Sequence, residues 1–514
     1  MSKRESMAEN QSPNLIEAAG LSKRFGNVLA LDSINFGVRK GEIHCLLGEN
    51  GAGKTTLAEC LYGFYKPDAG KIIYNGKSAE IASPRDAMEL GIGMVHQHFT
   101  LVDSHTVIEN LILDIAGNGL LLNIKEAEEK IREICKLYEV DLDPNVYVWQ
   151  LSVGQQQWVE ILKALLLGID LLILDEPTAV LTPQETIRLF SVLNRMKSEG
   201  LSIIFITHKL NEVIAVSDRV TVLRKGKLIG SVDTRDVTKE DLALMMVGRE
   251  VVFRIQKDNL EQGQPTLTIS DLYAYDDREL PALKGINLTV HQHEILGIAG
   301  VSGNGQKELF EVIIGVRSAT QGLINLGNES ILNNSPSQIL AKGVGRIPGD
   351  RNREGLILDF TIAENLILGR QWQSPYLHGL NFNNKEIKNR AINSLAQYEI
   401  MAPSIDCQTK KLSGGNLQKV ILARELGHPL KVLIAYQPCR GLDVGATEFV
   451  HRQLLEKRKS GAAILLISED LEEIFNLSDT ITVIYRGKIT GQFTASEAQL
   501  NKVGLLMAGI ESQV

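Results

Sequence analysis

Short apolar runs that end in glycine-rich or acidic turns recur along the chain and alternate with amphipathic stretches. The runs 43–47, 171–174 and 202–206 are apolar at nearly every position, which is typical of parallel strands buried on both faces. The stretch 125–138 instead has the spacing of one apolar helix face, at Ala127, Ile131, Ile134 and Leu137. Buried strands that alternate with helices predict an α/β fold.

This pattern occurs twice in the chain. The segment Ala-Leu-Asp-Ser-Ile-Asn from Ala30 is repeated as Ala-Leu-Lys-Gly-Ile-Asn from Ala282, at an offset of 252. Leu-Ser-Val-Gly-Gln from Leu151 is repeated as Leu-Ser-Gly-Gly-Asn from Leu412, at an offset of 261. The second copy therefore holds nine extra residues, and we expect a surface-loop insertion such as 371–383, because loops tolerate added length.

The repeat divides the 514 residues into two domains of similar size. We predict a polar N-terminal tail at 1–13, a first domain at 14–250, a linker at 251–265 and a second domain at 266–511. The tail lacks the apolar stretch of a signal peptide. No run of about 18 apolar residues occurs, so we expect nothing in the sequence to span a bilayer.

Composition narrows the possible functions. Hydrophobic residues make up 44% and charged residues 23%, as in an ordinary globular protein. The net charge of −8 argues against a general nucleic-acid binder, so we expect no nucleic-acid partner. The 5 cysteines are scattered and form no C-x-x-C pair. The sequence therefore predicts neither a disulfide framework nor a zinc framework, and it fits a reducing cytosol.

A phosphate-binding loop follows the first apolar run. The segment fits G-x-x-x-x-G-K-[ST] and leads into a helix, which is the context that this motif requires. Its glycines let backbone N–H groups surround a phosphate, the lysine reaches the terminal phosphates, and the threonine hydroxyl can bind Mg²⁺. The candidate nucleotide-binding residues are Gly48, Glu49, Asn50, Gly51, Ala52, Gly53, Lys54, Thr55 and Thr56.

Two acids follow the strand 171–174. Asp175 lies where a metal-binding acid is needed, and Glu176 can act as the general base that polarises the attacking water. His208 follows the strand 202–206, where it is either a packed core histidine or a contact to the γ-phosphate and the catalytic water. Gln97 carries little information alone, although an amide there can contact Mg²⁺ and water.

With these two motifs, the segment Leu-Ser-Val-Gly-Gln-Gln-Gln from Leu151 resembles the signature of ATP-binding-cassette (ABC) ATPases, and the resemblance covers nearly the whole chain twice. It implies two P-loop NTPase domains, each with a RecA-like core and a helical subdomain, that close head to tail around ATP and Mg²⁺. The expected Mg²⁺ ligands are Thr55, Gln97 and Asp175. Phe25 matches the aromatic position that stacks on adenine, with a core aromatic as the alternative.

The second half lacks most of this machinery. The offset places Gln306 at the lysine position, Lys307 at the threonine position and Gly349 at the position of Gln97. The acid pair is replaced by Tyr436 and Gln437. Glu469 stands in place of the histidine. Loss of a metal ligand, a base and a phosphate-binding lysine predicts negligible hydrolysis at this site.

The second signature is intact, with Ser413, Gly414 and Gly415. The family arrangement implies that it completes the site of the first half, whereas Ser152 and Gly154 face the eroded loop. Asp443, after the second acid-pair position, is expected to serve the complete site, and its counterpart Thr182 the eroded one. Erosion would then follow one composite site.

Tandem cassettes without membrane segments resemble either importer ATPases for sugars and nucleosides or soluble translation factors. The short linker and the eroded site favour the importer group. The segment Gly-Asp-Arg-Asn-Arg-Glu-Gly from Gly349 resembles sugar-importer second cassettes. The acid-free segment Ala-Tyr-Gln-Pro-Cys-Arg-Gly from Ala435 resembles the nucleoside branch, which we favour over ribose- or galactose-type importers.

The resemblance also implies partners: integral-membrane permease subunits and an extracytoplasmic solute-binding protein. The chain is then expected on the cytoplasmic face of the membrane, and to contact the membrane only through the permease. The sequence does not encode the solute or the identity of the permease.

Overall fold

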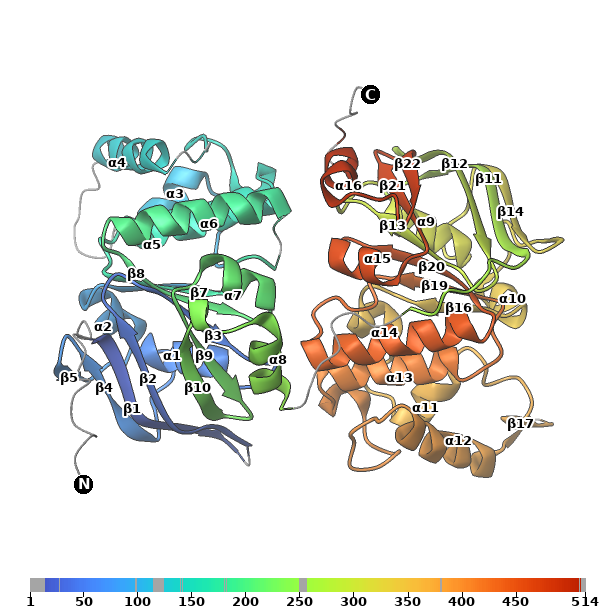
Figure 1. The fold of residues 1–514 in the computed structure, drawn as a ribbon, viewed down its shortest axis with the longest axis horizontal. Coiled ribbons are helices and arrows are strands. Elements are labelled where there is room, and N and C mark those ends of the chain that lie inside the picture. The colour runs from blue at the N-terminus through green and yellow to red at the C-terminus, as the bar shows by residue number, and fades with distance from the viewer. Residues whose placement is uncertain are drawn as a thin grey trace. The chain divides into compact units, whose positions relative to one another are not determined.

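The computed structural model describes residues 14–26, 28–97, 99–113, 124–138, 140, 142–179, 181, 183–248, 257–379, 381–507 and 509. Its internal contacts divide the chain into two units, Met1–Val251 and Val252–Val514 (Figure 1). The predicted tail 1–13 and the part 251–256 of the predicted linker lie outside the described residues.

The first unit contains two sheets. The antiparallel sheet has the order β2-β1-β4-β5 and the other sheet has the order β10-β9-β3-β8-β7-β6, which is parallel except for its edge strand β10. Strands β3, β7 and β8 are buried along their whole length, as their apolar sequences predict. The strands are β1 Asn14–Phe25, β2 Val28–Arg39, β3 Ile43–Leu47, β4 Ala69–Tyr74, β5 Lys77–Ala79, β6 Ile92–Val95, β7 Leu171–Asp175, β8 Ser202–Thr207, β9 Arg219–Arg224 and β10 Lys227–Asp233.

The helices of the first unit belong to two packing groups. Helices α3, α4 and α5 share a small apolar core of their own, while α1 packs in the core between the two sheets (Figure 1). This is the predicted combination of a RecA-like core with a helical subdomain. The helices are α1 Lys54–Leu61, α2 Pro84–Glu89, α3 Val107–Leu113, α4 Ile124–Leu137, α5 Val153–Leu165, α6 Pro183–Ser198, α7 Leu210–Val216 and α8 Lys239–Val247.

The second unit repeats this architecture, with sheets of order β12-β11-β14-β15 and β16-β19-β20-β13-β21-β22 and an added β17–β18 hairpin. Its strands are β11 Pro265–Tyr275, β12 Pro281–His291, β13 Ile295–Ala299, β14 Gln321–Leu326, β15 Glu329–Ser330, β16 Val344–Ile347, β17 Leu377–His378, β18 Asn381–Phe382, β19 Val432–Tyr436, β20 Ala463–Ser468, β21 Thr480–Tyr485 and β22 Lys488–Thr494. Its helices are α9 Gln306–Ile313, α10 Pro336–Ala341, α11 Ile362–Ile367, α12 Asn384–Gln397, α13 Gly414–Leu426, α14 Val444–Lys459, α15 Leu471–Leu477 and α16 Leu500–Met507.

The nine extra residues are spread over three places, so the expected loop insertion at 371–383 accounts for only the largest part of them. Thr106 and Thr361 cap α3 and α11 in the same way and are 255 apart, so three residues are added before Thr361, where the π-helical turn Arg351–Gly355 lies. The ends of α4 and α12 are 260 apart, and the next 3-10 turns are 261 apart. The β17–β18 hairpin therefore accounts for about five of the nine residues.

The described part of the predicted linker is attached to the second unit. Lys257 forms an ion pair of 3.1 Å with Asp479, and Arg458 donates to the backbone oxygen of Asp258 at 3.0 Å. Pro265, the last residue of the predicted linker, already begins β11. Within the described ranges, no helix is both long enough and apolar enough to cross a membrane.

Candidate functional site

The phosphate-binding loop of the first unit joins β3 to α1. Gly51 and Gly53 have φ values of 78° and 105°, which strongly favour glycine. A Cβ atom on Gly53 would lie 2.7 Å from the backbone oxygen of Ala30, so the loop packs too closely for a larger residue. The loop therefore leads directly into the N-terminus of α1, where backbone N–H groups favour an anion.

Two polar side chains at the end of this loop, Lys54 and Thr55, form hydrogen bonds within the site. The Lys54 ammonium is buried and donates to the backbone oxygens of Gly48, at 2.8 Å, and Glu49, at 3.1 Å. Thr55 begins the helix beside it and hydrogen-bonds Asp175. Of the other predicted residues, Asn50 is exposed, Ala52 is buried and Thr56 is half-buried.

Asp175 is the last residue of β7 and is almost completely buried, with 2% of its surface exposed. Burial raises the pKa of its carboxyl group, and the neighbouring charge of Glu176 raises it further. The hydrogen bond from Thr55 and the charge of Lys54 act in the opposite direction without cancelling the rise. The ionised form of Asp175 is therefore disfavoured in the protein without a cation, and a cation bound beside it would stabilise this form.

Glu176 has both carboxylate oxygens engaged. Oε1 accepts from Nδ1 of His208 at 2.9 Å, and Oε2 accepts from Nε2 of Gln97 at 3.3 Å. Burial raises the pKa of Glu176, but the hydrogen bond and charge of His208, together with the charge of Lys54, bring it below its ordinary value. Glu176 is therefore an ionised acceptor, and His208 is a partner of this acid.

The structure thus brings Lys54, Thr55, Asp175, Glu176, His208 and Gln97 into one connected site. The oxygen donors of Thr55 and Asp175 are the hard ligands that Mg²⁺ prefers. Gln97 donates to Glu176 through its nitrogen, so its Oε1 is the atom with which it would bind a cation. The donor set therefore fits the predicted Mg²⁺ ion.

Phe25, the predicted adenine-stacking residue, lies at the end of β1 with 41% of its surface exposed. The alternative of a core aromatic is therefore wrong. Its ring contacts Tyr65 edge to face, with centroids 5.0 Å apart. Tyr65 belongs to no sequence motif; it lies between α1 and β4, in the segment that leads into the strand paired with β1.

The corresponding loop of the second unit has a similar backbone conformation but a different side chain at the lysine position. Gly303 and Gly305 have φ values of 85° and 103°. Gln306 is buried; its Nε2 donates to the oxygen of Val301 at 2.9 Å and its Oε1 accepts from the N–H of Asn304 at 3.0 Å. The glutamine therefore occupies a backbone N–H of the loop and brings no positive charge.

Tyr436 stands at the position equivalent to Asp175 and replaces the acid with an aromatic ring. It packs on Phe310 with centroids 5.5 Å apart, and burial raises its pKa to about 12. A Cβ atom on Gly349 would lie 2.9 Å from this ring, so the glycine that replaces Gln97 makes room for it. Gln437 has a φ of 50°, as Glu176 has 48°, so the backbone turn is kept while the acid is lost.

The two signatures differ in what covers their glycines. Ser152 and Ser413 are N-caps of α5 and α13. A Cβ atom on Gly154 would collide with the carboxylate of Glu185, whereas the equivalent Gly415 faces the methyl group of Ala446. Glu185 was missed in the sequence, although the offset of 261 pairs it with Ala446 and shows an acid against an alanine.

Asp443 caps α14 by accepting from the N–H of Ala446 at 2.8 Å. Beside it, Arg351 donates to the backbone oxygens of Arg440, at 2.7 Å, and Gly441, at 3.2 Å. A Cβ atom on Gly414 would lie 3.0 Å from the same guanidinium, so Arg351 links the signature to the loop before Asp443. Thr182 lies outside the described residues.

Comparison with known proteins gives the class. The family model described as ABC transporter matches residues 31–179 and 283–440. The chain therefore belongs to the ABC transporter family, with two cassettes in tandem, as predicted.

Several curated relatives match along the whole chain. A guanosine import ATP-binding protein of Bacillus subtilis is 45% identical, over 96% of this chain and 97% of that protein. A nucleoside import ATP-binding protein of Lactococcus lactis is 44% identical, over 96% and 98%. A glucose import ATP-binding protein of Haloferax volcanii is 44% identical, over 95% and 94%. These relatives confirm the predicted class, an ABC-type ATPase of the nucleoside and sugar importer group.

The raised pKa of Asp175 predicts that Asp175→Asn increases the free energy of unfolding at pH 7 in the absence of nucleotide. Because the folded-state pKa is raised, the ionised form opposes folding above it, and the amide keeps the acceptor for Thr55. We expect a gain on the order of 1 kcal/mol, or about 2–4 °C in Tm for a domain of this size. The gain should shrink as the pH falls through the raised pKa toward the ordinary value of an aspartate, because the wild-type carboxyl then becomes protonated.

Asp241→Asn is the matched control for thermal unfolding. The pKa of Asp241 is lowered by hydrogen bonds from Thr238, so its ionised form favours folding and its loss should lower Tm at pH 7. A wild-type protein with a higher Tm than Asp175→Asn at pH 7 would contradict the raised pKa of Asp175.

Proposed function

We propose that the chain is the ATP-hydrolysing subunit of an importer for nucleosides, with one competent and one degenerate ATP site. The observation that carries the asymmetry is the pair of equivalent turns: Glu176 with His208 and Gln97 in the first cassette, Gln437 beside a buried tyrosine in the second. The names of the three relatives support import as the process that is powered.

The residues of the first cassette have distinct roles in this proposal. Lys54 leaves the loop oxygens and binds the β- and γ-phosphates, and Glu176 takes a proton from the attacking water. His208 orients Glu176 and contacts the γ-phosphate, while Phe25 stacks on the base. Mg²⁺, held by Thr55, Asp175 and Gln97, supplies charge neutralisation at the phosphates when it is bound. Gly48 to Gly53 provide backbone N–H groups.

The second signature is proposed to complete this site. Ser413, Gly414 and Gly415 would donate to the γ-phosphate, and Asp443 would contact the loop opposite. The side chain of Glu185 supports the asymmetry, because it crowds the signature glycine Gly154, whereas a methyl group lies beside Gly415. Ala446 at the equivalent place carries no charge.

Importer function implies partners that supply the membrane path. We propose that integral-membrane permease subunits bind the chain on the cytoplasmic face, and that an extracytoplasmic protein delivers the solute. Closure of the cassettes on ATP would then change the access of the permease, and hydrolysis would reset it.

A nucleoside is favoured as the solute over a free sugar. The acid-free segment around Gln437 resembles the nucleoside branch, and two of the three relatives are named for nucleosides. The glucose importer is equally similar in sequence, so a sugar remains the second candidate. The alternative of a translation factor gains no support from these relatives.

Glu176→Gln should lower ATP turnover about 100-fold or more, because a general base is lost, while ATP binding is kept. Phosphate release and binding of a fluorescent ATP analogue measure the two quantities. Gln437→Ala, at the equivalent position of the second cassette, should leave turnover near the wild-type value. Normal turnover in Glu176→Gln would show that another group is the base.

Ser413→Ala should reduce turnover about 100-fold, whereas Ser152→Ala should change it by less than about threefold, since only the first is proposed to face the competent site. Both serines cap a helix, so both variants lose about 1 kcal/mol of capping and control for each other's stability. Equal effects on turnover would refute the asymmetric assignment.

Uptake of labelled solutes tests the process itself. Cells that lack the chain should regain guanosine uptake when the wild type is restored, and not when Glu176→Gln is restored. Restored uptake of glucose or ribose without guanosine would make the sugar candidate correct. Co-sedimentation with ribosomes, with no solute effect, would overturn import.

A further inference from the structure

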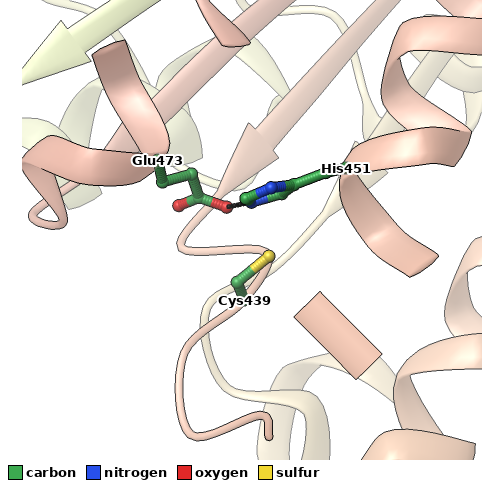
Figure 2. Close-up of side chains that lie close together, drawn as sticks. All are labelled: Cys439, His451 and Glu473. Carbon is green, nitrogen blue, oxygen red and sulfur yellow. Dashed lines mark ion pairs between the residues drawn. The ribbon is translucent and has the colours of Figure 1, made fainter. Parts of the chain in front are cut away.

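Three metal-binding side chains converge in the second cassette, outside the ATP site. Cys439 lies in the loop after β19, His451 on α14 and Glu473 on α15. Their donor atoms all lie within 4.8 Å of one another, and Figure 2 shows the sulfur, the imidazole ring and the carboxylate turned toward a common space. The residues come from three separate elements, so no local sequence motif announces them.

The first cassette shows what this place requires. Its equivalent of Glu473 is Glu212, a buried carboxylate. Thr178 donates to it at 2.6 Å, Thr207 donates at 2.7 Å, and the Lys209 ammonium lies 3.1 Å away. Two hydroxyl groups and one positive charge therefore compensate this buried carboxylate.

The second cassette has kept the carboxylate and replaced two of the three groups that surround it. Ser468 still donates to Oε2 of Glu473 at 2.6 Å, in the place of Thr207. Cys439 stands where Thr178 was, and Asp470 stands where Lys209 was, so an ammonium has become a second acid. The ammonium that pairs with Glu212 in the first cassette therefore has no counterpart at this position.

One oxygen of Glu473, Oε1, lacks the hydroxyl and ammonium contacts that the equivalent oxygen of Glu212 has in the first cassette. The side chain is only 3% exposed, and among the described residues Oε1 has no hydrogen-bond partner. It faces Nε2 of His451 at 3.4 Å, and that nitrogen also lacks a hydrogen-bond partner there. His451 replaces Phe190 of the first cassette, so a ligand-type side chain has appeared beside this oxygen.

We propose that Cys439, His451 and Glu473 bind one zinc ion. In tetrahedral coordination, bonds of about 2.0–2.1 Å separate a nitrogen ligand from an oxygen ligand by about 3.3 Å. The observed 3.4 Å matches this spacing and exceeds that of a good hydrogen bond. Sulfur, imidazole and carboxylate together suit zinc better than the hard cation of the ATP site, and water would fill the fourth position.

Binding balances in charge and protons. The thiol of a free cysteine is protonated near neutral pH. When zinc binds, the S–H bond breaks, an S–Zn bond forms and the proton leaves to solvent. The thiolate and Glu473 then neutralise the two charges of zinc. The ion would connect α14 and α15 to the loop that leads to Asp443.

Zinc binding by the full chain, freed of metal with a chelator, tests the proposal. Titration against a chromophoric chelator should give one zinc ion per chain, and Co²⁺ should give a thiolate-to-cobalt absorption band. Cys439→Thr and His451→Phe restore the side chains of the first cassette. Each should weaken zinc binding about 100-fold or more, which exceeds the effect expected when a residue that only hydrogen-bonds a ligand is lost. Cys439→Thr should also abolish the cobalt band.

Cys407→Ser, at another partly buried cysteine of the same cassette, should keep both signals. Zinc should also raise the Tm of the wild type but not of the two variants. If Cys439→Thr fails to unfold cooperatively, Cys439→Ser replaces it. Absence of stoichiometric binding, or binding that both substitutions leave unchanged, would overturn the site and leave His451 and Glu473 as a plain ion pair.

Discussion

The competence of each cassette depends on one backbone turn at the end of a buried strand. The residue after β7 has a left-handed φ, and its N–H donates to the adjacent strand at 3.0 Å; the residue after β19 does the same at 2.8 Å. This geometry is therefore a property of the fold, because Glu176 and Gln437 adopt it equally. The side chain at the turn then decides whether the cassette has a base. The proposed loss of hydrolysis in the second cassette therefore needs no change of architecture.

Adjacent carboxylates at this turn are held in opposite ways. Asp175 is enclosed by the strand, so burial raises its pKa, while Glu176 turns toward His208 and has its pKa lowered. Two acids that are neighbours in the sequence thereby have pKa values shifted in opposite directions, which fits the proposed roles of cation ligand and general base. Because burial raises the pKa of Asp175, a cation bound beside it would favour the ionised form, which would couple the stability of the cassette to its ligand.

The fold and most of the candidate site could be predicted from the sequence, because the relevant signals are local. The phosphate-binding loop, the acid pair and the signatures each lie within a few residues, and the internal repeat shows which copy has lost them. What could not be predicted depends on packing between distant segments. Glu185 reaches Gly154 across two helices, Arg351 joins two loops from a three-residue addition, and the absence of C-x-x-C excluded only zinc sites with local ligand spacing.

A cassette that is proposed not to hydrolyse ATP still has to compensate the charges in its interior. The network around Glu212 joins the loop after β7 to α7, and its equivalent around Glu473 occupies the same buried place. A buried carboxylate that loses an ammonium and a hydroxyl must be protonated, removed or paired anew, since an uncompensated charge costs several kcal/mol. The chain kept Glu473 and gained a thiol and an imidazole beside it. This combination is expected where a metal ion has taken over the compensation, and it places the new ligands next to the loop whose acids were lost.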